Sequence, residues 1–208
     1  MLIFDKVTVS RNGKPLFLPI SVSVSPGEIL TVSGASGLGK STLLHALIQP
    51  SSGVELLGTV HFDGNMMDQT HRLSSFSQTV FQDPLLFPHL SVGSNIALSI
   101  NQLCSSEREK RVHHLLSDME LSGLANHDPF QLSRGQMMRV SVARALAPHP
   151  KILLLDEPFS ALDHRTRDRI RDLLFDQIRL HLSYGVLVTH QPEDQPSEGP
   201  CVCLTAFS

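Results

Sequence analysis

The stretch GASGLGKS, from Gly34 to Ser41, constrains the fold of this chain more than any other part of the sequence. It fits G-x-x-x-x-G-K-[ST], the pattern of a phosphate-binding loop, provided that a strand precedes it and a helix follows. The apolar run EILTVSG, from Glu28 to Gly34, is typical of a buried strand, and the run from Lys40 is typical of a helix that Pro50 ends. An ordinary glycine turn is the alternative, but it does not explain the whole pattern together with both flanks. We therefore expect a strand, a loop and a helix that hold phosphate groups.

The residue types in this loop indicate its chemistry. Glycines let backbone N–H groups wrap around phosphates, and the start of the following helix adds positive potential. Lys40 is expected to reach the outer phosphates, and the Ser41 hydroxyl is expected to hold Mg²⁺.

A second apolar run, ILLLDEP, places Asp156 and Glu157 at the end of another buried strand. Asp156 is expected near the metal, and Glu157 is expected to face a water beside the γ-phosphate. A turn followed by a capped helix would also place two acids there. Together with the phosphate loop, the two acids favour a nucleoside triphosphatase site.

The order of strand-like and helical runs predicts an α/β fold, a P-loop NTPase core with a mainly parallel sheet. Early alternating runs with turns at Asn12-Gly13 and Pro26-Gly27 predict an N-terminal antiparallel β subdomain. The helical pattern of about 84–147 predicts a helical subdomain inserted in the core. Within it, Ser106-x-x-Glu109 matches a capping box, which predicts the start of a helix.

Composition excludes several classes of protein. A chain of 208 residues, 41% of them hydrophobic, can bury one sizeable core. Its formal charge of −3 is spread along the sequence, so we expect no nucleic-acid partner. The first ten residues do not resemble a signal peptide, and the longest aliphatic runs are far shorter than the ~20 residues that span a bilayer. We expect a soluble chain.

Three cysteines, Cys104, Cys201 and Cys203, show neither a disulfide framework nor regular zinc-ligand spacing. Cys201 and Cys203 alternate with Val202 in an apolar stretch near the end of the sequence. This alternation favours one face of a buried strand over metal binding or redox chemistry.

Six motifs resemble those of ABC transporter ATPases and occur in the same order. They are GASGLGKST, the glutamine of VFQDP, LSRGQ, ILLLDEP, SALD and the histidine of LVTH. The resemblance runs from the first strand to at least His190. It implies one ABC-type ATPase domain over residues 1–208, with ATP and Mg²⁺ as its ligands.

The resemblance also implies roles for individual residues. Gln82 is expected to contact the metal or the attacking water, Asp156 to position Mg²⁺ together with Ser41, and Glu157 to act as the general base. Asp163 is expected to link two sites across a dimer, and His190 to contact the γ-phosphate. The loop residues assigned to phosphate and metal binding are Gly34, Ala35, Ser36, Gly37, Leu38, Gly39, Lys40, Ser41 and Thr42.

LSRGQ resembles the signature segment that, in this family, binds the γ-phosphate of ATP held by a second ATPase subunit. Ser133, the amide of Gly135 and a helix N-terminus would supply the donors. Gln136 belongs to the same segment and also completes a capping box with Ser133. We therefore expect ATP to close a pair of chains, with a homodimer as the simplest form.

The stretch PLLFPHLSV, from Pro84 to Val92, is rich in apolar residues for a loop. Buried packing is one explanation. The resemblance implies another, in which Leu85, Leu86 and Phe87 contact a short helix of a transmembrane permease subunit. The sequence of this region is most similar to that of import-type systems. We therefore expect solute uptake together with a solute-binding protein. We also expect the chain to be cytoplasmic and to lie on the inner face of the cell membrane.

Two positions depart from the family pattern. Arg11 stands where many members stack an aromatic residue on adenine, and a guanidinium plane can also stack on a base. Arg134 replaces a glycine of the signature. Two alternatives stay open: a soluble ABC-type ATPase that acts on DNA or ribosomes, and a regulator that binds nucleotide but scarcely hydrolyses it. No accessory regulatory domain is expected after Pro200.

Overall fold

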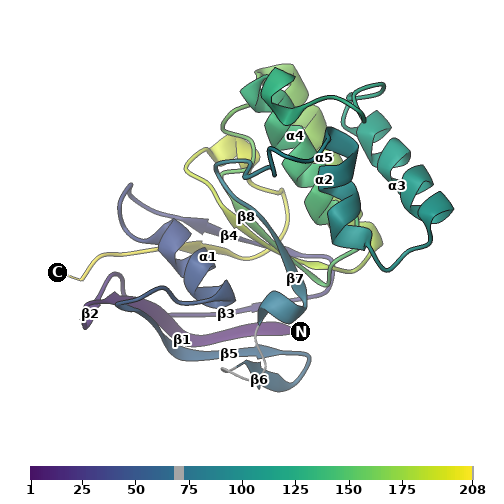
Figure 1. Ribbon diagram of the computed structural model, residues 1–208. Helices are drawn as coiled ribbons and strands as arrows, with labels where there is room; N and C mark the ends of the chain where they lie inside the picture. The colour runs from purple at the N-terminus through teal and green to yellow at the C-terminus, as the bar shows by residue number, and fades with distance from the viewer. Residues whose placement is uncertain (68–72, 208) are drawn as a thin grey trace. The chain divides into compact units, whose positions relative to one another are not determined.

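The computed structural model describes residues 1–67 and 73–207 of the chain (Figure 1). The chain divides into two compact units. The first, called the core unit, comprises Met1–Gln78, Lys151–Glu157 and Phe175–Ser208. The second, called the helical unit, comprises Thr79–Pro150 and Pro158–Leu174.

An antiparallel sheet opens the core unit. Its strands are β1 (Leu2–Arg11), β2 (Lys14–Pro15), β3 (Ile20–Val24), β5 (Val54–Phe62) and β6 (Asn65–Met67). The strand order is β2-β1-β5-β6, and β3 also pairs with β1.

The pairing of β1 with β5 shifts register between Asp5 and Thr8. Gly58 of β5 lies opposite this bulge, where an added Cβ would come within 2.3 Å of the Lys6 carbonyl oxygen. Only glycine fits such an approach. The predicted N-terminal antiparallel sheet is confirmed.

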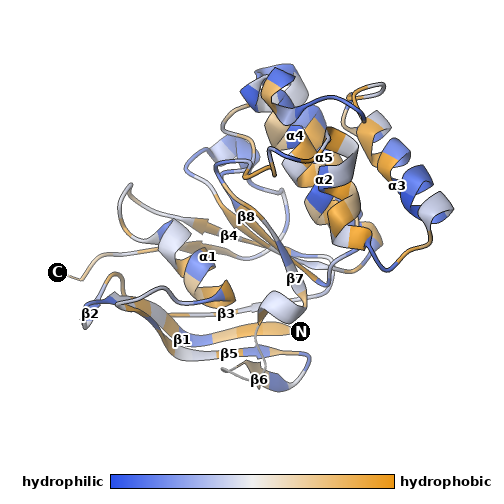
Figure 2. Cartoon of the chain, in the orientation of Figure 1, coloured by the Kyte–Doolittle hydropathy of each residue, from blue (hydrophilic) through white to orange (hydrophobic). Residues whose placement is uncertain are grey.

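A second sheet carries the phosphate loop. Its strand order is β10 (Cys201–Cys203), β4 (Ile29–Ser33), β9 (Tyr184–Val188), β8 (Ile152–Asp156) and β7 (Ser77–Val80). The pairs β10/β4, β4/β9 and β8/β9 are parallel. Every residue of β8 and β9 is buried, as their apolar sequences predict (Figure 2). The predicted α/β fold is confirmed.

Helix α1 (Lys40–Ile48) packs between the two sheets of the core unit. Leu43, Leu44 and Leu47 belong to the same hydrophobic cluster as Phe4 of β1 and Leu154 of β8. Burying aliphatic side chains of this size stabilises the core by about 1.5–3 kcal/mol each. This packing holds the N-terminal end of α1 against the end of β4.

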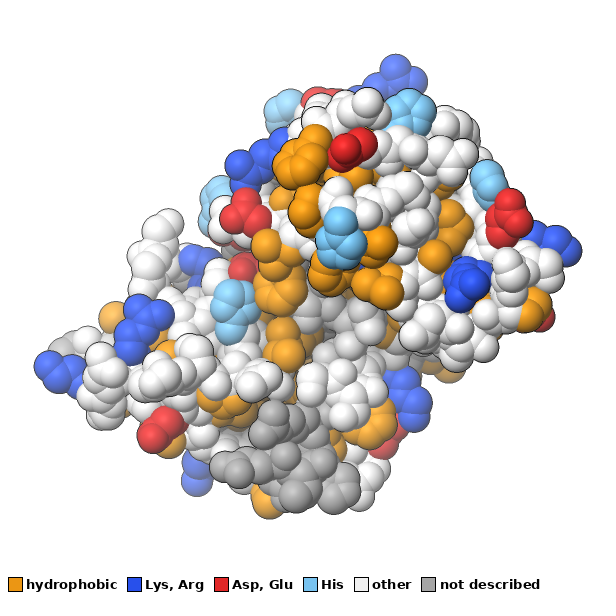
Figure 3. Space-filling view, viewed as in Figure 1, with side chains coloured by type: hydrophobic (Ala, Val, Ile, Leu, Met, Phe, Trp, Pro, Cys, Tyr) orange, Lys and Arg blue, Asp and Glu red, His pale blue; other side chains and the backbone are white. Residues whose placement is uncertain are grey.

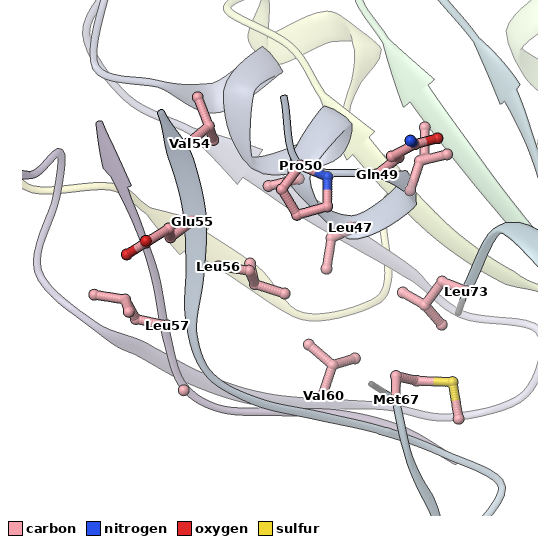
Figure 4. A pocket seen from close by; sticks show the side chains of 13 residues that line it. Leu47, Gln49, Pro50, Val54, Glu55, Leu56, Leu57, Val60, Met67 and Leu73 are labelled. Carbon is pink, nitrogen blue, oxygen red and sulfur yellow. The ribbon is translucent and has the colours of Figure 1, made fainter. Parts of the chain in front are cut away.

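A hollow of about 600 Å³ lies at the other end of α1. Figure 4 shows Leu47 of α1 and Leu56 and Val60 of β5 around it. Since α1 rises about 1.5 Å per residue, its nine residues separate this hollow from the phosphate loop by roughly 12 Å. The hollow is therefore distinct from the N-terminal end of the helix, where the glycine-rich loop lies.

The helical unit contains α2 (Val92–Ala97), α3 (Ser105–Asp118) and α4 (Arg134–Leu146), and α5 (His164–Leu180) begins in it. Short 3₁₀ turns are η2 (Leu98–Ile100) and η3 (Pro129–Gln131) here, with η1 (Leu73–Ser75) and η4 (Pro192–Asp194) in the core unit.

The predicted capping box at Ser106 is wrong. Helix α3 begins at Ser105 with Cys104 as its N-cap, so Ser106 lies inside the first turn. The buried residues of α3 are Val112, Leu115 and Leu116. Their packing stabilises the helix without a capping box at its start.

The terminal cysteines also differ from the sequence prediction. They do lie in a strand, β10, but both Cys201 and Cys203 are exposed. Val202, between them, lies on the opposite face of β10 and packs against the core. Across residues 1–67 and 73–207, the structure has no helix with the length and apolar character of a membrane span.

Candidate functional site

The phosphate loop follows the sequence prediction in its backbone. It leaves β4 after Ser33, and α1 begins at Lys40 with Gly39 as its N-cap. Gly34, Gly37 and Gly39 have φ values of 141°, 79° and 97°, which other residues rarely adopt. An added Cβ at Gly39 would also meet the Leu16 side chain at 2.8 Å. The backbone conformation therefore favours glycine at the start of α1, and a larger residue would also displace the end of the Leu16 side chain.

Lys40 is turned back over this loop. Its Nζ donates hydrogen bonds to the carbonyl oxygens of Gly34 at 2.9 Å and Ala35 at 3.0 Å. The side chain is buried along its length, so its ammonium charge is concentrated at the centre of the loop. Since α1 also starts here, two sources of positive potential coincide. This arrangement suits a polyphosphate.

The Ser41 hydroxyl donates a hydrogen bond of 2.9 Å to Oδ1 of Asp156. Asp156 is only 3% exposed, and burial raises the pKa of its carboxyl, while the Ser41 hydrogen bond acts in the opposite direction. A hydroxyl and a carboxylate oxygen are ligands that Mg²⁺ accepts. Among the described residues no group of three or more His, Cys, Asp or Glu could hold a metal. A magnesium ion here would therefore keep waters and phosphate oxygens as its other ligands.

Glu157 follows Asp156 in a strained backbone conformation with φ of 46°. Its N–H donates to the carbonyl oxygen of Val188 at 3.0 Å, which ties the end of β8 to the end of β9. Its Oε1 lies 3.0 Å from Nδ1 of His190, just beyond β9. The Glu157 side chain is 19% exposed, so it can meet a water while its direction is held by His190.

The signature segment lies in the helical unit and begins α4. Ser133 Oγ accepts a hydrogen bond from the Gln136 N–H at 3.2 Å, and Gln136 Oε1 accepts one from the Ser133 N–H at 2.9 Å. This is the predicted capping box. An added Cβ at Gly135 would meet the Ala161 carbonyl oxygen at 3.2 Å. The start of α4 is thus packed directly against the SALD segment.

Asp163 caps the first turn of α5 in the same unit. Its Oδ1 accepts a hydrogen bond from the Thr166 N–H at 3.1 Å. This hydrogen bond lowers the pKa of the Asp163 carboxyl, which is therefore ionised at neutral pH. Gln82 also belongs to the helical unit, just after β7.

The predicted site residues thus fall into two sets. The core unit brings together the loop, Asp156, Glu157 and His190, while the helical unit holds Gln82, Asp163 and the signature segment. Arg11 is exposed at the end of β1, opposite Lys14 of β2.

One contact in the helical unit was not predicted from the sequence. Arg134, at the first position of α4, forms an ion pair of 2.8 Å with Asp83, the residue after Gln82. Both side chains are well exposed, so the pair adds little to stability, roughly 1 kcal/mol or less. The only signal in the sequence was the opposite charge of two motif residues that lie 51 positions apart.

Comparison with known proteins decides the family. A family model described as ABC transporter matches residues 17–160 of the chain. The chain belongs to the ABC transporter family. Its fold is that of an ABC cassette. It is similar to a dimeric structure of a post-hydrolysis state of the ATP-binding cassette MJ0796 bound to ADP and Pi, with a TM-score of 0.83 and 31% identity, covering 99% of this chain and 94% of that one.

The cassette is also similar to ATP-binding proteins of two bacteria. This ABC cassette is 38% identical over 199 residues to the putrescine transport ATP-binding protein PotG of Escherichia coli (strain K12), covering 93% of the cassette and 52% of PotG. It is 39% identical over 193 residues to the aliphatic sulfonates import ATP-binding protein SsuB of Bacillus subtilis (strain 168), covering 92% of the cassette and 73% of SsuB. The cassette spans about half the length of PotG and of several other relatives that it matches.

Asp156 gives this ABC cassette a testable pH dependence. Burial raises the pKa of the Asp156 carboxyl above its ordinary value of 3.8. Its contribution to the free energy of unfolding is therefore fully present at a pH below 3.8 and is lost as the pH rises through the folded-state pKa. At neutral pH the buried charge is therefore a cost. Without nucleotide, Asp156→Asn is expected to raise the melting temperature at pH 7, and the gain should shrink below pH ~4. Thermal unfolding across this range checks it, with the exposed Asp5→Asn as control, and a variant less stable than the wild type at pH 7 would contradict it.

Proposed function

We propose that this ABC cassette binds and hydrolyses ATP and that its cycle powers solute uptake through separate membrane subunits. The observation that carries the proposal is the hydrogen bond between Ser41 and Asp156, with Glu157 next in the chain and in contact with His190. These contacts place the glycine-rich loop, a hydroxyl and carboxylate pair that would suit Mg²⁺, and a carboxylate that could act as a base at one end of the sheet. The similarity to PotG, a transport ATP-binding protein, supports a role in transport, and the similarity to SsuB, an import ATP-binding protein, supports uptake as its direction.

The core unit would supply most of the groups that bind the phosphates and Mg²⁺. The loop amides and Lys40 would bind the β- and γ-phosphates, and Lys40 would exchange its bonds to the loop carbonyls for phosphate oxygens. Ser41 and Asp156 would hold Mg²⁺, which when bound offsets charge on the β- and γ-phosphate oxygens. Gln82 is proposed as a further ligand of the metal or the water.

Glu157 is proposed to accept a proton from the water that attacks the γ-phosphorus. The bond between this phosphorus and the oxygen that bridges to the β-phosphate then breaks, and ADP and inorganic phosphate are released. His190 is held 3.0 Å from the Glu157 carboxylate, so it can orient this base and face the γ-phosphate with its other nitrogen. The positive φ of Glu157 costs conformational energy, and such strain is common where a side chain must be held in one position for function.

The signature segment is proposed to bind the ATP of a second copy of the cassette. The capping box keeps Ser133 and the first amides of α4 in position, and the helix start favours an anion. Asp163, anchored at the first turn of α5, would connect the two sites. ATP would then close the pair and hydrolysis would reopen it. Arg11 is proposed to stack its guanidinium plane on the adenine ring of ATP.

A docking surface for the permease is proposed at the loop that follows Gln82. Figure 3 shows hydrophobic side chains gathered on the viewer-facing surface of the helical unit, and Leu85 and Phe87 are among its exposed residues, with Leu86 partly buried beside them. Two internal anchors hold the loop in shape. Buried Asn95 accepts a hydrogen bond from the Phe87 N–H at 2.7 Å, and Arg144 donates to the Leu85 carbonyl oxygen at 3.0 Å.

The experiment that tests the proposed activity is phosphate release from MgATP by the purified chain. We expect slow basal turnover that requires Mg²⁺ and increases when the proposed permease partner is added. Binding of MgATP without measurable phosphate release, alone and with the permease, would favour the nucleotide-dependent regulator. Turnover that increases with DNA or ribosomes instead of the permease would favour the soluble ATPase.

The docking surface has its own prediction. Leu85→Ser combined with Phe87→Ser is expected to abolish the increase in turnover that the permease causes, because each change removes apolar area from the interface. The matched control is Leu180→Ser, another exposed leucine, which should keep the increase. Turnover measured against permease concentration checks it, and equal responses of both variants would place the docking surface elsewhere.

A further inference from the structure

Cys201 and Cys203 form an exposed pair of thiols on one face of β10. Both are free cysteines, and the residue between them, Val202, packs against the core from the opposite face of the strand. Free cysteines are usually among the most buried residues of a protein. Packing in the core therefore does not explain why two free cysteines lie on the exposed face of this edge strand.

The spacing of this thiol pair excludes a disulfide and suits a shared ligand. Side chains two positions apart on a strand are separated by about 6.6 Å, whereas a disulfide needs Cβ atoms about 3.8 Å apart. An ion with two metal–sulfur bonds of about 2.3 Å bridges sulfurs ~4.6 Å apart, which rotation about the two Cα–Cβ bonds allows. We propose that Cys201 and Cys203 bind one soft metal ion in two-coordinate geometry.

The absence of further ligands selects the class of ion. Among the described residues, no third His, Cys, Asp or Glu joins the pair in a metal-binding group. Zinc usually requires four ligands, and Mg²⁺ requires oxygen ligands, so neither is satisfied here. Thiolates select soft ions such as Cu⁺. Binding exchanges two S–H bonds for two metal–sulfur bonds and releases two protons, with no change in oxidation state.

This thiol pair borders the phosphate loop. Cys203 is in register with Ser33, the last residue of β4, and the N–H of Leu204 donates to the Ser33 carbonyl oxygen at 2.9 Å. An added Cβ at Gly34 would lie 3.1 Å from the Leu204 carbonyl oxygen, so the strand end and the loop are in contact. An ion bound to both thiols would restrict the motion of β10 and is therefore expected to change the affinity of the loop for MgATP. This second expectation rests on the proposed function.

The test is anaerobic titration of the full chain with Cu⁺ held by a coloured chelator. Wild type is expected to remove one equivalent of Cu⁺ from the chelator, and Cys201→Ser or Cys203→Ser should weaken binding by on the order of 100-fold or more. The matched control is Cys104→Ser, the third exposed cysteine, which should bind as wild type does. X-ray absorption should report two sulfur neighbours for the bound ion.

Several results would overturn the site. They are equal binding by wild type and the double variant C201S/C203S, more than two sulfur neighbours, and one ion bridging two chains. The titration needs no nucleotide, so its result is independent of whether the cassette hydrolyses ATP. The affinity for MgATP is then measured with and without Cu⁺. A change in wild type that the double variant lacks supports the link to the loop, and no change overturns that link.

Discussion

Glu157→Gln is expected to slow ATP turnover by on the order of 100-fold or more while MgATP still binds, because general-base catalysis contributes roughly this much. Glutamine keeps the shape of the side chain and its contact distance to His190, but it cannot accept the proton of the attacking water. The loop and the Ser41–Asp156 pair are unchanged. Phosphate release and nucleotide binding, measured on the same preparation, check both halves of the expectation.

The same variant tests the proposed pairing of two chains. If hydrolysis reopens the pair, Glu157→Gln with MgATP should accumulate as a dimer in size-exclusion chromatography, and wild type should not. The exposed Glu198→Gln, which changes charge equally outside the site, serves as the control and should behave as wild type. Unchanged turnover in the Glu157 variant would remove this residue from the mechanism. A variant that binds MgATP but stays monomeric would remove the shared site.

Lys40→Ala is expected to weaken MgATP binding by roughly 10- to 100-fold and to reduce turnover with it. Charge-assisted hydrogen bonds contribute about 1.5–3 kcal/mol each, and the buried ammonium at the loop centre is positioned to make them with phosphate oxygens. Titration with a fluorescent ATP analogue measures the affinity. The control, Lys14→Ala, removes an equal charge from the exposed strand β2 of the same unit.

Two outcomes of the Lys40 experiment are informative. Equal affinities of the Lys40 and Lys14 variants would show that the loop lysine does not bind the nucleotide. A loss of folding, seen as a lower melting temperature without nucleotide, would show that the hydrogen bonds to Gly34 and Ala35 support the loop itself. Thermal unfolding of both variants separates these cases.

Local patterns predicted much of the fold because their physical causes are local. The phosphate loop was predicted from glycine spacing, and positive φ values at Gly34, Gly37 and Gly39 explain that spacing. Strands β8 and β9 appeared as continuous apolar runs because both of their faces are buried.

The same reasoning failed where packing decides between equal local signals. Ser133 and Ser106 both start a capping-box pattern, yet only Ser133 caps a helix. The segment 158–174 groups with residues 79–150 in the helical unit, a long-range relation that no short pattern contains. Cys201 and Cys203 alternate like buried residues, but the face of β10 that carries them is exposed, and only the opposite face, with Val202, packs against the core.

The sequence alone determined which chemical groups this cassette carries: a phosphate loop, two acids at a strand end, a signature segment and a histidine after the apolar run GVLV. Each depends on spacing within a few residues, where backbone geometry acts directly. The tertiary structure decided which groups meet. Ser41 reaches Asp156 across 115 positions, and Glu157 reaches His190 across 33, because parallel strands β4, β8 and β9 end at one edge of the sheet. Contacts of that range depend on burial of the whole core, which no short pattern contains.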